Sequence, residues 1–210
     1  MSINATDLYE DGPAAGAKAK ILLIHFDGAI DAGGAGRMAI GQMLRSLHNE
    51  RVATFDADAL VDYRSHRPII TVEDWVSSPD MVMPQTVLDL VEDDMGNPIL
   101  VLHGAEPDAH WESFTNAISG ICERAGVEIT FSLHGVPSGV PHTRPTPVHV
   151  QATDASLLPA GGATIANHMQ FPAPLSTFVQ IRMGQRGMGG LALLGAVPFY
   201  MADTGYPAAS

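Results

Sequence analysis

Short apolar runs bounded by turn residues constrain the fold of this chain more than any other feature. Ile21–Phe26 and Leu191–Val197 are apolar almost throughout, which is typical of strands buried on both faces of a sheet. Ile99–Leu102 has the same character, and Val127–Leu133 alternates apolar with polar residues, as expected for a strand with one drier face. The sequence therefore predicts at least four sheet strands.

Helical spacing of apolar residues appears between these runs. It predicts a helix over Pro107–Ala125, where the proline suits the first turn. A second helix is predicted around the stripe formed by Ile40, Leu44 and Leu47. Strands that alternate with helices favour an α/β fold, arranged as a three-layer α/β/α sandwich with a largely parallel sheet. A predicted hairpin over Val87–Leu102 makes that sheet mixed.

The chain ends and the composition bound the organisation. Residues 1–19 are polar and rich in Ala and Gly, so we expect a flexible leader followed by a single domain over residues 20–210. The leader has no apolar segment of the kind that a secretion signal needs. Cys122 is the single cysteine, which excludes an internal disulfide and fits a cytoplasmic location. A net charge of −12 disfavours nucleic acid, and the apolar runs are too short to span a membrane.

A glycine pattern at Gly34-x-Gly36-x-x-Ala39 matches a dinucleotide-binding fingerprint in spacing. Asp56 lies where such a site places its ribose-binding acid. However, seven residues separate Phe26 from Gly34, and the fingerprint needs its first glycine directly after the strand. We therefore expect no cofactor and interpret the glycines as a connection that packs closely against the sheet.

Metal and nucleophile motifs are weak. There are nine histidines but no His-Glu-x-x-His pattern, and one cysteine cannot supply a Cys-rich zinc site. Ser138 lies in a Gly135–Gly139 stretch that resembles a nucleophile elbow with its serine displaced by one position. We predict no metal ligands and no catalytic residues.

Polar residues follow several of the predicted strands. Because the carboxyl ends of parallel strands meet at one edge of a sheet, ligands bind there in open α/β folds. This topology predicts a candidate ligand-binding cluster of Asp27, Asp31, His103, Glu106, His142 and Arg144. The alternative is structural, with Arg144 pairing with an acid to hold the proline-rich loop of residues 135–147.

Several segments together resemble the PAC2 family, the proteasome-assembly-chaperone-like proteins, and its actinobacterial members in particular. The resemblance covers about Lys20 to Pro207. It is carried by Ile24–Gly34, Glu106–Asp108 with Trp111 and Phe114, Gly135–Pro137, Pro141–Pro145 and Met188–Gly190. The stretch Gly-Val-Pro followed by Pro-His-Thr-Arg-Pro is its most specific part.

The resemblance implies a phosphorylase/hydrolase-like α/β/α fold and a protein–protein interaction module, assembly-chaperone-like and homo-oligomeric, with a partner such as a proteasome subunit. It implies no catalytic residues. The alternative is an enzyme acting on a small anionic or nucleoside-like substrate, phosphorylase-like or ATP-dependent ligase-like. The likeness also implies that bacterial relatives continue beyond Ser210 into a further helical extension.

Overall fold

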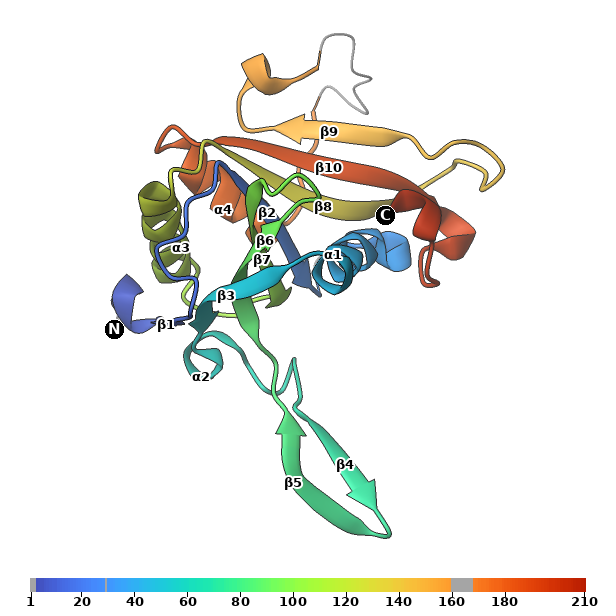
Figure 1. The fold of residues 1–210 in the computed structure, drawn as a ribbon. Coiled ribbons are helices and arrows are strands. Elements are labelled where there is room, and N and C mark those ends of the chain that lie inside the picture. The colour runs from blue at the N-terminus through green and yellow to red at the C-terminus, as the bar shows by residue number, and fades with distance from the viewer. Residues whose placement is uncertain (1–2, 29, 160–167) are drawn as a thin grey trace.

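The computed structural model describes residues 3–28, 30–159 and 168–210, which form a mixed sheet flanked by helices (Figure 1). Eight strands make up the sheet. In spatial order they are β1 (Tyr9–Asp11), β3 (Asn49–Phe55), β6 (Thr86–Glu92), β7 (Pro98–Ala105), β2 (Ile21–Asp27), β8 (Ile129–Ser138), β10 (Gly189–Pro198) and β9 (Val148–Ala152). The central strands β7, β2, β8 and β10 are parallel, and antiparallel pairs lie on both sides.

Helices cover both faces of this sheet. Helix α1 (Ala35–Ser46) packs on one face, and α3 (Trp111–Ala125) and α4 (Leu175–Gly184) pack on the other. A short helix, α2 (Ala57–Leu60), follows β3. The predicted α/β class with a mixed sheet is therefore confirmed. The helix predicted from Pro107 begins four residues later at Trp111, and β8 continues through Ser138 into a stretch predicted as loop.

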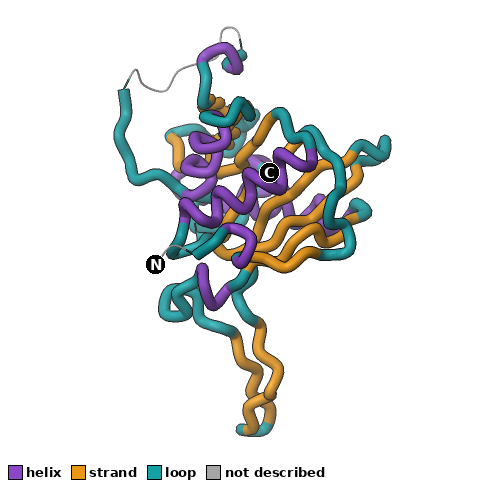
Figure 2. The backbone as a smooth tube through the Cα atoms, turned by 90° about the vertical axis from the view of Figure 1, so that its left-hand side faces the viewer, coloured by secondary structure: helices purple, strands orange, loops and turns teal. Residues whose placement is uncertain are grey.

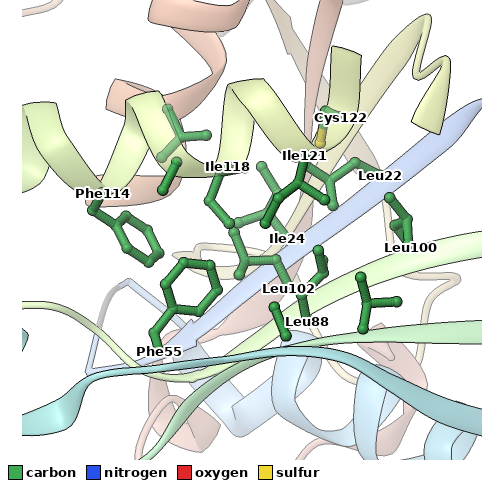
Figure 3. Packing of buried hydrophobic residues seen from close by; sticks show 14 of the residues in the cluster. Leu22, Ile24, Phe55, Leu88, Leu100, Leu102, Phe114, Ile118, Ile121 and Cys122 are labelled. Carbon is green, nitrogen blue, oxygen red and sulfur yellow. The ribbon is translucent and has the colours of Figure 1, made fainter. Parts of the chain in front are cut away.

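The pleat of β2 explains why this strand is apolar on both faces. Leu22, Ile24 and Phe26 are fully buried in the cluster beneath α3 and α4. Leu23 points to the opposite face and packs with α1. In Figure 3, Phe55 faces Phe114 across the same cluster, with ring centroids 4.8 Å apart. Burying such side chains supplies about 1.5–3 kcal/mol each, which makes this cluster the main stabilising feature.

The N-terminal segment differs from the expected flexible leader. Strand β1 pairs with β3, and Leu8 is completely buried in the main core. The Asp56 N–H donates to the Leu8 carbonyl over 2.9 Å, so the segment is joined to the domain by backbone bonds as well. Ala19 is buried in the same core, and Ile3, Ala5, Tyr9 and Ala14 pack against it, so residues 3–19 contact the domain at several points.

A separate two-stranded hairpin projects from the body. Strands β4 (Ile69–Glu73) and β5 (Val76–Val82) pair with each other but not with the main sheet. Figures 1 and 2 show them extending away from the sheet and helices. The two turn residues, Asp74 and Trp75, have positive φ values of 47° and 65°. This arm is not among the elements predicted from the sequence.

Candidate functional site

The carboxyl end of β2 forms a hollow of about 370 Å³ that contains Asp27 and Asp31. Asp31 is fixed by three backbone N–H groups: Gly36 and Gly135 donate to its Oδ1 over 2.8 and 2.9 Å, and Arg37 donates to its Oδ2 over 3.1 Å. The carboxylate therefore lies at the N-terminus of α1, where the helix dipole favours a negative charge. Asp27 is exposed at the rim.

His25 lies beneath this hollow, with its side chain only 4% exposed. Its Nδ1 is 3.0 Å from the Leu133 carbonyl, which can only accept, so Nδ1 carries a proton. The other ring nitrogen, Nε2, is buried without a hydrogen bond and lies 3.6 Å from Asp31 Oδ2. The Nε2 atom therefore faces the Asp31 carboxylate across the space between the sheet and α1.

The charge of the hollow restricts what it can bind. Asp27, Asp31 and Asp203 line it, against the single guanidinium of Arg37. The first N–H groups of α1 already bind Asp31, so they do not offer a phosphate site. Asp56, the acid of the dinucleotide fingerprint, instead caps α2 by accepting from the Asp58 and Ala59 N–H groups. The arrangement suits hydroxyl or amine donors better than the small anions that we considered from the sequence.

His103 lies apart from this hollow, in a buried network on the α1 face. Its Nε2 is 2.8 Å from Asp89 Oδ2, and Arg51 binds the other oxygen of Asp89. Burial by itself raises the pKa of Asp89, but the hydrogen bonds from His103 and Arg51 and the charge of Arg51 outweigh it. The pKa of Asp89 is therefore lowered. This network joins β3, β6 and β7.

The remaining predicted residues have other partners. Glu106 accepts the Leu175 N–H over 2.7 Å and so caps α4, on the opposite face of the sheet from His103. His142 lies against Tyr200, with Nδ1 2.7 Å from the phenol oxygen. Arg144 is exposed and forms no ion pair with the described residues. The structure thus brings Asp27 and Asp31 together and places the other four elsewhere; whether any of them binds a ligand is still a prediction.

The structure also contains a serine–histidine pair that was not predicted from the sequence. Ser176 Oγ lies 3.2 Å from His134 Nε2, and His134 Nδ1 lies 3.0 Å from the Ile30 carbonyl. Burial lowers the pKa of His134, which favours the neutral ring that can accept from the serine. Ser176 is completely buried, so the pair joins α4 to β8 without facing a substrate. No spacing in the sequence signals this pair.

Within the described ranges, no group of His, Cys, Asp and Glu side chains is arranged to hold a metal ion.

The β4–β5 hairpin carries a group of large exposed apolar side chains. Both strands and the turn contribute large side chains that are at least half exposed, and Trp75 at the turn is 98% exposed. These side chains are Ile69, Ile70, Val72, Trp75, Val76, Met81 and Val82. In the sequence, the corresponding signal is a stretch of apolar residues that follows neither helical spacing nor regular alternation.

Fold and surface together define an α/β/α domain with a projecting apolar hairpin and a small acidic hollow. Residues 25–210 match the family model described as PAC2 family. The chain belongs to the PAC2 family. No curated protein matches the sequence. Among the solved structures, a Mycobacterium tuberculosis protein of unknown function is 34% identical, with a TM-score of 0.88 over 96% of this chain and 70% of that one.

Two further structures extend this comparison. A Corynebacterium glutamicum protein of unknown function is 30% identical, with a TM-score of 0.86 over 96% of this chain and 77% of that chain. A Mycobacterium tuberculosis proteasome-assembly chaperone homologue is 23% identical, with a TM-score of 0.78 over 87% of this chain and 77% of that one. At this identity the last comparison shows the fold alone. No helix in the described part of the chain is long and apolar enough to cross a membrane.

Proposed function

We propose that this protein is an interaction module that associates with itself and binds other proteins, in the manner of an assembly chaperone. The observation that carries the proposal is the β4–β5 hairpin, a projecting element whose large apolar side chains are in water. Partner binding in the cytoplasm, without nucleic acid or membrane, is the role that fits this surface and the net charge of −12.

The hairpin is costly for an isolated molecule. A two-stranded ribbon is marginally stable in water, because too few side chains cover its apolar faces. Both of its outer edges also lack neighbouring strands in the described structure, which leaves N–H and C=O groups free to pair with another chain. Continuous exposed apolar surface of this kind marks protein–protein contact sites. A partner that covers the hairpin would bury its apolar side chains and pair its free N–H and C=O groups.

The relatives suggest the kind of partner. Structures with this fold include a proteasome-assembly chaperone homologue and a Pyrococcus furiosus archaeal proteasome activator, the latter 14% identical with a TM-score of 0.63. We therefore propose a proteasome subunit as a partner, in addition to further copies of this chain. The hairpin supplies the apolar contact area that either partner requires.

The test compares the wild-type chain with a variant in which residues 69–83 are replaced by a short Gly-Ser link. Light scattering over a range of concentrations is expected to give an oligomer for the wild type and a smaller species for the variant. The melting temperature of the body should change little, because the hairpin shares no buried core with it. Phe199→Ser, which changes a 67% exposed aromatic side chain outside the hairpin, is the matched control and should stay oligomeric.

A second arm mixes the wild type and the hairpin variant with purified proteasome core subunits and follows complex formation by size-exclusion chromatography. Binding by the wild type and loss of binding by the variant support the proposal. A wild-type chain that remains monomeric and forms no complex with these subunits contradicts it.

A further inference from the structure

We infer that the hollow at the carboxyl end of β2 binds a small zwitterion, a molecule such as an amino acid that carries both an ammonium group and a carboxylate. The hollow has a volume of about 370 Å³ and is lined by the end of β2, the turn before α1, the first turn of α1 and residues 202–205. Hollows of this size hold small molecules. The inference goes beyond the proposed function, because it concerns the body of the domain and a ligand instead of a protein partner.

Backbone hydrogen bonds hold the walls of the hollow together. The Gly33 N–H donates to the Ala202 carbonyl over 2.7 Å, and the Tyr206 N–H donates to the Gly33 carbonyl over 2.9 Å. Tyr206 is buried beside this junction. Figure 1 shows the C-terminal end of the chain beside α1, and the two segments are in contact. The hollow is therefore formed by segments that are fixed to one another.

The base of the hollow has two hydrogen-bond acceptors that face each other. His25 is almost completely buried, and its Nδ1 proton is donated to the Leu133 carbonyl, so Nε2 of the neutral ring is an acceptor. Nε2 has no hydrogen bond and lies 3.6 Å from Asp31 Oδ2. That oxygen accepts one N–H group, from Arg37, and can accept another hydrogen bond.

An ammonium group satisfies both of these acceptors. A nitrogen that carries two or more protons can lie about 2.9 Å from Nε2 and from Oδ2 at the same time, because the two atoms are 3.6 Å apart. A buried acceptor that lacks a donor is unfavourable, so a donor in this position stabilises the site. The positive charge also lies beside the Asp31 carboxylate.

The rim of the hollow carries opposite charges that do not pair with each other. Asp27, Asp203 and Arg37 line the hollow with exposed side chains. Among the described residues, none of the three forms an ion pair. The two carboxylates are available to an ammonium group, and the Arg37 guanidinium can donate two parallel hydrogen bonds to a carboxylate.

This combination of charges discriminates between classes of ligand. A polyamine would be repelled by the Arg37 guanidinium, and a phosphate or dicarboxylate would be repelled by the three aspartates of the hollow. A molecule with one ammonium group and one carboxylate avoids both repulsions. The zwitterion is therefore the ligand that fits the base and the rim together.

The experiment measures binding by isothermal titration calorimetry with glycine, γ-aminobutyrate and ε-aminocaproate, which differ in the distance between their two charges. Putrescine and butyrate each carry only one kind of charge. At least one zwitterion is expected to bind the wild type, and putrescine and butyrate should bind at least about tenfold more weakly. Arg37→Gln and Asp203→Asn should each weaken binding of the zwitterion at least about tenfold. Arg45→Gln on α1 and Asp94→Asn in the β6–β7 turn change exposed charges outside the hollow and should leave binding unchanged.

Nitrogen NMR of the histidine rings tests the base of the hollow. The zwitterion that binds is expected to shift the Nε2 resonance of His25 and to leave that of the exposed His110 unchanged. A His25 ring that carries protons on both nitrogens at neutral pH would contradict the inference, because Asp31 would then be the partner of Nε2.

Three results of the calorimetry would overturn the inference. The first is a wild type that binds none of the three zwitterions at millimolar concentrations, and the second is binding that Arg37→Gln and Asp203→Asn leave unchanged. The third is putrescine binding as tightly as any zwitterion, which would indicate a site for amines alone. None of these results bears on the oligomer and the proteasome complex that test the proposed function, so the two proposals fail separately.

Discussion

At the scale of single residues, hydrogen bonds within the molecule account for the burial of several polar side chains. Asp31, Glu106 and His103 were candidate ligand-binding residues, yet each has partners within the molecule. Asp31 and Glu106 cap the N-termini of α1 and α4, and His103 shares the Asp89 carboxylate with Arg51. A buried carboxylate is stabilising only while these partners remain.

Asp89 should therefore contribute to the fall in the free energy of unfolding as the pH becomes acidic. Its pKa is lowered in the folded protein, so its contribution is complete above the unfolded value of about 4 and is lost as pH falls through the lower folded value. Asp89→Asn should lower the free energy of unfolding at pH 7 by about 2 kcal/mol. Below about pH 4, urea unfolding should show a smaller pH dependence for the variant than for the wild type.

The control is Asp94→Asn, which changes an exposed acid in the β6–β7 turn. It should match the wild type at neutral pH. Equal acid slopes for the wild type and Asp89→Asn would show that the Asp89 network does not stabilise the fold through its charge.

At the scale of elements, close backbone contact positions α1 and its leading turn against β8. A Cβ built on Gly135 would lie 1.9 Å from the Ala32 carbonyl oxygen, and one on Gly36 would lie 2.4 Å from the Leu133 oxygen. Both glycines bring the Asp31 carboxylate within reach of two elements. The smallest residue is required there because the atoms in the way are backbone.

Gly135→Ala should lower the free energy of unfolding by about 3 kcal/mol, since neither backbone can move without displacing the other. Gly139→Ala is the matched control, because nothing lies within 4 Å of the added carbon, and its effect should be less than about 0.5 kcal/mol. Chemical denaturation of both variants provides the comparison. A Gly135→Ala protein as stable as the control would mean that α1 and β8 separate easily.

At the scale of the whole molecule, one domain includes the N-terminal segment, and one arm projects from it. The main core combines residues far apart in the chain, from Leu8 near the N-terminus to Met188 before β10. The hairpin adds nothing to that core. The body is therefore expected to unfold as a unit, with the arm outside its core.

Leu8→Ala tests the place of the N-terminal segment in this unit. Leu8 is completely buried, so its truncation should lower the free energy of unfolding by about 2–5 kcal/mol. Leu158→Ala changes a leucine that is 44% exposed and should cost less than about 1 kcal/mol. Guanidinium unfolding followed by circular dichroism measures both. If Leu8→Ala lowers the free energy of unfolding no more than Leu158→Ala does, the result would support the flexible leader expected from the composition.

The sequence by itself determined the central strands of the sheet, helices α1 and α3, and the family. Apolar periodicity is local, and runs such as Ile21–Phe26 can be buried only within a sheet covered on both faces. The Gly-Val-Pro and Pro-His-Thr-Arg-Pro stretch pointed to the PAC2 family, which the family model confirms over residues 25–210.

Only the tertiary structure decided which polar residues meet. The loops after parallel strands do share an edge, but side chains there turn to different faces of the sheet. His25 and His103 are register partners on the α1 face, whereas Glu106 reaches α4 on the other. The hairpin is a further case, because weak periodicity cannot tell a buried apolar run from one held out in water. The direction and exposure of a side chain depend on contacts with residues far away in the chain, and local sequence spacing does not predict those contacts.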